Sequence, residues 1–120
     1  MFKRDFIMDQ IEQMAQFLGK IVFNKTNTEA EVIQEGNVIN QTLLLKRTLK
    51  NMIAKNKINE AENLLFREVG KQPNEANLEI GVWFYTELTK LDEATLLQAN
   101  FSKAEILEGL TALKKMILPS

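Results

Sequence analysis

The side chains of this chain that could take part in chemistry are carboxylates, lysines, arginines and a single tryptophan, because the sequence contains neither cysteine nor histidine. That composition excludes thiolate nucleophiles, imidazole acid–base catalysis, zinc sites and disulfide bonds. Neither serine stands in a nucleophile motif, since Ser102 matches a helix cap and Ser120 is the last residue. The glycines are scattered singly, so no phosphate-binding loop is present. We therefore expect a non-enzymatic protein with no catalytic residue, no cofactor and no metal.

One row of carboxylates could in principle bind a metal ion. Asp5, Asp9 and Glu12 follow i, i+4, i+7 spacing, which places them along one side of a helix. Hard cations take oxygen ligands, but good sites wrap around the ion with a flexible loop. Three carboxylates along a straight helix do not converge in this way. We expect this row to be a solvated helix face.

The strongest local charge imbalance lies between Gly36 and Asn59, a stretch without any acid. Its bases are Lys46, Arg47, Lys50, Lys55 and Lys57. On a helix, the first three share an arc of about 100°, opposite Leu45 and Leu49. Such a stripe is typical of a solvated face, and the alternatives are an acidic protein partner or, less favoured, a nucleic acid. The stretch has no aromatic residue on which bases could stack.

Trp83 is the most informative single residue. Its helical position falls on the polar side of its segment, near Glu79 and Glu87, whereas the apolar residues point the other way. A tryptophan on a polar face often anchors a partner, because its ring is large and rigid and its indole N–H can donate. The competing interpretation, which we favour, is that another part of the same chain covers it.

A repeated phrase predicts the helices that would position these residues. A capping residue followed by a charged residue and Ala begins at Thr28, Asn59, Asn74, Asp92 and Ser102. Glu31, Glu62 and Glu105 would complete capping boxes in three of these phrases. With an N-terminal helix, the phrases predict six helices and no strands. The predicted ranges are 3–23, 29–55, 60–70, 75–90, 93–99 and 103–117.

Helical spacing also predicts which faces are buried. The first helix has a stripe of apolar residues with Phe2, Phe6 and Phe17 along its edge, and we expect this edge to be core, with a homodimer seam as the alternative. In the second helix the apolar side changes near Gly36. Either a kink at Gly36 or packing against different neighbours at the two ends would explain that change, and we favour the packing.

Two resemblances support a helical fold. Residues 45–74 resemble one tetratricopeptide-type helical hairpin, through Leu45, Met52, Ile58, the Glu60–Ala61 pair, Leu65 and Pro73–Asn74. The pattern departs where that repeat has small residues, because this chain has Leu49 and Glu68 there. The residues at 1–8 (MFKRDFIM), 58–66 (INEAENLLF) and 100–106 (NFSKAEI), with Gly109–Leu110, resemble a family of small bacterial helical proteins known only as a domain of unknown function. This resemblance implies an all-helical, tetratricopeptide-like fold and a bacterial cytoplasmic origin, and it implies no activity.

Taken together, these observations predict one compact all-α domain over residues 1–120. We expect it to bind another protein or a second copy of itself, with Trp83, Lys46, Arg47 and Lys50 as candidate contact residues. The alternative is an anionic ligand or nucleic acid along Lys46–Lys57. No apolar run is long enough to span a membrane and no signal-peptide core is evident, so we expect a cytoplasmic protein. No small-molecule substrate is indicated.

Overall fold

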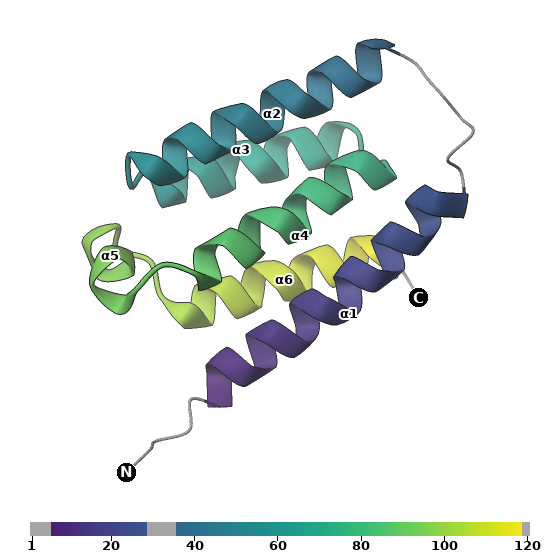
Figure 1. Cartoon of the computed structure of the whole chain (residues 1–120). Coiled ribbons are helices and arrows are strands. Elements are labelled where there is room, and N and C mark those ends of the chain that lie inside the picture. Colours follow the sequence, from purple (N-terminus) through teal and green to yellow (C-terminus); the bar gives the residue numbers. More distant parts are fainter. Residues whose placement is uncertain (1–5, 29–35, 119–120) are drawn as a thin grey trace.

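The computed structural model describes residues 6–28 and 36–118, and describes side chains for 6–22 and 41–118. The described residues form six helices and no strand, as the sequence predicts (Figure 1). The helices are α1 (Phe6–Thr28), α2 (Gly36–Ala54), α3 (Ile58–Lys71), α4 (Glu75–Thr89), α5 (Glu93–Gln98) and α6 (Lys103–Ile117).

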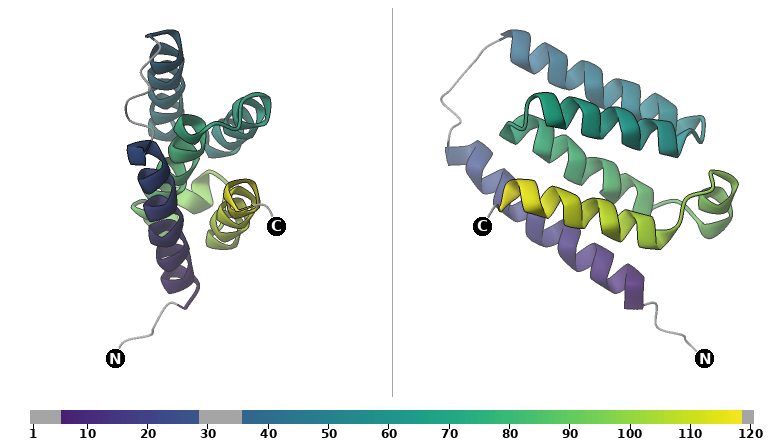
Figure 2. Two further views of the ribbon diagram at one scale, coloured as in Figure 1. Left: turned by 90° about the vertical axis from the view of Figure 1, so that its right-hand side faces the viewer. Right: turned by 180° about the vertical axis from the view of Figure 1, so that it is seen from behind.

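The five long helices pack in two layers. One layer contains α2, α4 and α1 side by side, and the other contains α3 and α6 (Figure 2). Helix α4 is central and contacts each of the other long helices, whereas α1 contacts only α4 and α6. The short α5 lies at one end, where it connects α4 to α6.

The central position of α4 explains its sequence. A helix that neighbours cover on most sides must be apolar over most of its circumference. Six large side chains of α4 are buried: Leu78, Ile80, Val82, Phe84, Tyr85 and Leu88. The outer helices bury only one stripe each, for example Ala61, Leu65 and Val69 on α3. Buried side chains from all six helices belong to one continuous core.

Two glycines allow α4 and α6 to pack closely. A Cβ atom on Gly109 of α6 would lie 2.2 Å from Cζ of Tyr85 on α4. A Cβ atom on Gly81 of α4 would lie 2.9 Å from both Cδ atoms of Leu113 on α6. The Tyr85 ring therefore occupies the space that a side chain at position 109 would need.

Three of the predicted helix caps are confirmed. The side chains of Asn74 and Asp92 each accept a hydrogen bond from the backbone N–H three residues on, at 2.8 Å. Ser102 and Glu105 form the predicted capping box, in which each side chain accepts from the other residue's backbone N–H. These bonds satisfy N–H groups that have no partner within the helix.

The predicted cap at Asn59 is wrong. Helix α3 begins at Ile58, two residues before its predicted start, and Lys57 in the cap position makes no side-chain bond. The turn before it is closed by Asn56, which takes up a left-handed backbone conformation with φ of 62°. Asn59 Nδ2 instead donates to the carbonyl oxygens of Ala99, at 3.0 Å, and Asn100, at 3.4 Å. Its amide therefore ties the start of α3 to the turn between α5 and α6.

This bonding pattern gives a prediction that distinguishes a helix cap at Asn59 from a side-chain bond to the turn between α5 and α6. Replacing Asn59 by Ala should lower the free energy of unfolding by about 1–2 kcal/mol, because two carbonyl oxygens lose their donor. Asn59→Asp should be at least as damaging, since a carboxylate cannot donate. A capping role predicts the opposite for Asp, which caps as well as Asn. Urea denaturation of both variants checks this, and a harmless Asn59→Asp would contradict the assigned role.

The predicted start of the second helix at Thr28 is also wrong, because Thr28 is the last residue of α1. No glycine or proline stands between Gly19 and Gly36 to end the first helix near residue 23. Residues 29–35, including Glu31, lie outside the described part of the chain. Gly36 is the first residue of α2, so it marks no kink inside that helix.

One predicted core feature, the phenylalanine edge of the first helix, is exposed instead. Phe6 and Phe17 on α1 are 70% and 47% exposed, because the face of α1 that packs on α4 and α6 contains Ile11, Leu18 and Val22. Phe2 lies outside the described residues. On α2, Leu43 is 56% exposed, since the buried side of this helix is that of Leu45 and Leu49.

Candidate interaction surface

The basic residues of α2 lie on the side that faces away from the core. Lys46, Arg47 and Lys50 are exposed, while Leu45 and Leu49 on the opposite side are buried and hold α2 against its neighbours. Leu43 precedes the three bases at i−3, i−4 and i−7, so all four residues share one row along the helix. We call Leu43, Lys46, Arg47 and Lys50 the α2 stripe.

Trp83 lies beside this stripe, a proximity that the sequence alone did not predict. The Lys46 ammonium is 5.1 Å from the centroid of the Trp83 ring, within the range of a cation–π contact. Trp83 is half-buried and packs against the core. The side chain is thus covered in part by Lys46 of the same chain. Two features that were separate in the sequence form one surface between α2 and α4.

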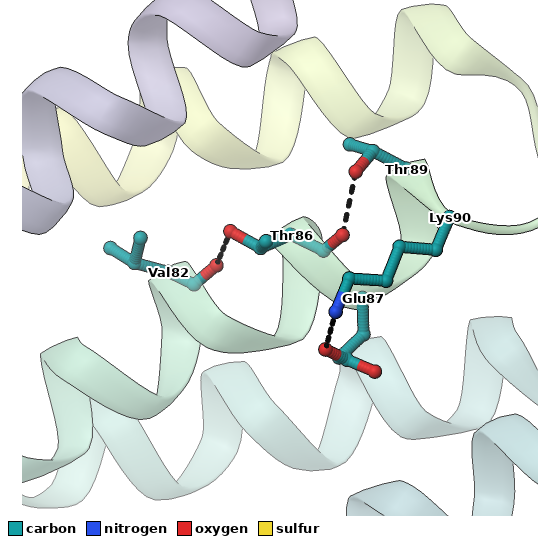
Figure 3. A network of polar contacts seen from close by, with 5 residues as sticks. All are labelled: Val82, Thr86, Glu87, Thr89 and Lys90. Carbon is teal, nitrogen blue, oxygen red and sulfur yellow. Dashed lines mark hydrogen bonds and ion pairs between the residues drawn. The ribbon is translucent and has the colours of Figure 1, made fainter.

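The other polar side chains on the second half of α4 are satisfied locally (Figure 3). Thr86 and Thr89 donate to backbone carbonyl oxygens of α4, at 2.9 and 2.6 Å. Lys90 pairs with Glu87 at 2.9 Å. Thr86, Thr89, Glu87 and Lys90 therefore have the local polar contacts that are usual on a solvated helix face. Trp83 is unusual on such a face, because it is a large aromatic side chain.

A cavity of about 480 Å³ opens on a different side of α2, between α2, α3 and the turn before α4. Its lining combines leucines, such as Leu44 and Leu64, with amide and hydroxyl side chains. Several of the polar groups already hold the turn together, because Asn77 donates to the Gln72 carbonyl and Asn74 caps α4. This cavity was not predicted from the sequence. The sequence signal that could have indicated it is that Gln41 and Thr48 are polar. They line the contact between two helices, where apolar residues are usual.

A buried tyrosine and a carboxyl group connect α4 to α3. Tyr85 is fully buried and its hydroxyl donates to Glu62 Oε2 at 2.5 Å. Burial raises the pKa of Tyr85 well above its usual range, and the bond to Glu62 raises it further. Partial burial also raises the pKa of Glu62 above its ordinary value near 4.5. The bond from Tyr85 opposes this rise, while the charges of Glu105 and Glu108 add to it.

The raised pKa of Glu62 predicts how stability depends on pH. The folded state binds the Glu62 proton more tightly than the unfolded state, so this contribution to stability is complete below the ordinary pKa of 4.5 that the residue has in the unfolded chain. It is lost as the pH rises through the folded pKa. Glu62→Gln removes the charge but keeps an acceptor for Tyr85. The variant should therefore gain stability over the native chain as the pH is raised from about 4 to 7.

Chemical denaturation at several pH values measures that difference directly. Glu79→Gln, at an exposed position on α4, is the matched control for loss of one negative charge. A gap between Glu62→Gln and the native chain that stays constant with pH would contradict the assignment.

Two of the three carboxylates of the predicted row, Asp9 and Glu12, lie on α1 in the described part of the chain. Asp9 is half-buried, Glu12 is exposed, and Asp5 lies outside the described residues. No group of three or more acidic side chains that could hold an ion occurs among the residues with described positions.

A protein-family model matches nearly the whole chain. The model of a family of unknown function, DUF6483, covers residues 1–117. The chain belongs to DUF6483. No curated protein and no solved structure matches this DUF6483 chain. In its described residues, no helix is long and apolar enough to cross a membrane.

Proposed function

We propose that this DUF6483 protein is a non-catalytic helical module that binds other proteins through the surface formed by the α2 stripe and Trp83. The observation that carries the proposal is the position of the Lys46 ammonium over the Trp83 ring. That contact places the exposed bases, an exposed leucine and the chain's only tryptophan on one continuous surface. Arginine and tryptophan are enriched among the residues that dominate binding energy at protein interfaces.

The arrangement of the helices supports a tetratricopeptide-like role. Helices α2, α4 and α1 lie side by side, and α3 and α6 pack behind them. Stacked helical hairpins of this type use an extended face of one layer for recognition. In this proposal the recognition face is the α2–α4 part of the layer that contains α2, α4 and α1. Helix α1 closes the other end of that layer.

Photo-crosslinking tests the proposal. A photoreactive amino acid is placed at position 43 on α2 or position 79 on α4 in cells that produce the protein. The matched control is position 114 on α6, which is exposed on the other layer. We expect protein adducts from positions 43 and 79 and few from position 114. Absence of adducts, or equal yields at all three positions, would contradict the proposed surface.

The alternative function is binding of an anionic ligand or nucleic acid along Lys46–Lys57. It is favoured by one observation, since Lys55 and Lys57 are also exposed and extend the basic surface past the end of α2. Binding to heparin should then weaken steeply with salt, because counterions are released. It should also disappear in the Lys46→Glu/Arg47→Glu/Lys50→Glu variant.

A further inference from the structure

The bases of the α2 stripe differ from four bases elsewhere in the described part of the chain, which pair with carboxylates. Arg67 and Lys71 lie within 4.0 Å of Glu68, and Lys103 is 3.0 Å from Glu93. Among the described residues, Arg47 and Lys50 form no ion pair, and Lys46 contacts the Trp83 ring. The stripe therefore presents positive charge that the described part of the chain does not neutralise.

An exposed apolar residue lies next to the bases of the α2 stripe. Leu43 is 56% exposed and is one turn before Lys46 and Arg47. The row from Leu43 to Lys50 is about 10 Å long at the usual helical rise. Exposed leucines occur singly on many surfaces, but here the leucine is aligned with unpaired cations along one straight row.

Resting on the proposed function, we infer that the α2 stripe is a docking site for an acidic amphipathic helix of a partner protein. A helix with an apolar side chain and carboxylates at i+3, i+4 and i+7 matches the row in both spacing and charge. Its apolar side chain covers Leu43, and its carboxylates pair with Lys46, Arg47 and Lys50.

Two other classes of occupant fit less well. A nucleic acid would neutralise the bases but would not bury Leu43, and the aromatic ring nearest the stripe is half-buried under Lys46. A membrane surface requires a helix with a free apolar face, whereas the apolar face of α2, with Leu45 and Leu49, is buried in the core. Charge and apolar area together favour the acidic helix.

The chain contains its own reporter for this binding. Trp83 is the only tryptophan, and Lys46 lies over its ring. A carboxylate that pairs with Lys46 changes the surroundings of the indole, so its fluorescence should change on binding. The probe is a tryptophan-free synthetic peptide of about 20 residues, with leucine at every third or fourth position and glutamate on both sides of that apolar stripe.

We expect the probe to bind the full chain saturably and at least about tenfold more tightly than a peptide of the same composition in scrambled order. Leu43→Ala and the Arg47→Glu/Lys50→Glu variant should each weaken binding by about tenfold or more, since each removes one half of the recognition. Both leave the Lys46–Trp83 reporter in place. The matched control is Lys114→Glu/Lys115→Glu, two exposed bases on α6, which should bind like the native chain. Because all of these positions are exposed or surface-lying, circular dichroism should confirm that each variant is folded.

Several results would overturn the inference. Equal affinity for the ordered and scrambled peptides, or for the native chain and Arg47→Glu/Lys50→Glu, would remove the basis for an acidic helix. Tight binding of heparin or phosphatidylglycerol vesicles without binding of the peptide would identify a polyanion or a membrane instead. Sedimentation showing a dimer that the same variants dissociate, again without peptide binding, would identify a second copy as the occupant.

The crosslinking experiment keeps the two proposals distinguishable. Crosslinks from positions 43 and 79 together with failure of the peptide would leave a protein-binding surface but reject the acidic helix. Failure of both experiments would reject the surface itself.

Discussion

Replacing Gly109 by Ala should destabilise the protein by about 3 kcal/mol or more, which is at the upper end for adding a methyl group to a packed interior. The new Cβ would lie 2.2 Å from both Cζ and the hydroxyl oxygen of Tyr85. Tyr85 cannot simply rotate away, because its ring is fully buried and its hydroxyl is bonded to Glu62. Helices α4 and α6 must therefore separate, or the tyrosine must leave the core. Urea denaturation measures the loss.

Gly70→Ala is the matched control, because a Cβ there would meet nothing within 4 Å. Alanine is the better helix former, so this variant should gain about 0.5–1 kcal/mol. A double-mutant cycle with Tyr85→Leu tests the cause. The cost of Gly109→Ala should fall when the tyrosine ring is absent. An unchanged cost in that background would show that the Tyr85 contact is not responsible.

Phe84→Ala should cost about 3–5 kcal/mol of unfolding free energy, the range for removing a buried aromatic ring. Phe84 is fully buried on the central helix, and its ring centroid lies 5.0 Å from that of Tyr85 in an edge-to-face arrangement. Because α4 contacts every other long helix, a cavity at this position weakens the packing of both layers. Thermal and urea denaturation check the size of the effect.

Phe17→Ala provides the comparison for Phe84→Ala. Phe17 was predicted to be core but is 47% exposed on α1. Its replacement should change stability by less than about 0.5 kcal/mol, as is usual for surface substitutions. A loss at Phe17 as large as at Phe84 would show that the edge of α1 is covered in solution, which is what a homodimer seam along this edge would produce.

These stability predictions concern the scaffold, and the proposed interaction surface lies outside its core. Lys46, Arg47, Lys50 and Leu43 are all exposed, so replacing them should alter binding far more than folding. Trp83 belongs to both the core and the proposed interaction surface, since it packs against the core and contacts Lys46. Variants of the α2 stripe are therefore better tests of function than variants of the tryptophan.

The all-helical class, most helix positions and three caps follow from the sequence. Caps at Asn74, Asp92 and Ser102 were predictable because a cap bonds a backbone group within three residues. Burial on α4 and α6 was predictable because helical periodicity places apolar residues on defined faces.

Features that depend on contacts between distant segments were not predictable from local spacing. Asn59 fits a cap by its type, yet its amide bonds the turn after α5, some 40 residues away. Phe6, Phe17 and Leu43 fit an apolar stripe, yet α1 and α2 lie at opposite ends of the layer that α2, α4 and α1 form. None of the described helices covers the outer sides of α1 and α2 there. The contact between Lys46 and Trp83 depends on how α2 packs against α4. Local spacing defines a helix face, but the neighbours that cover the face are set by packing of the whole chain.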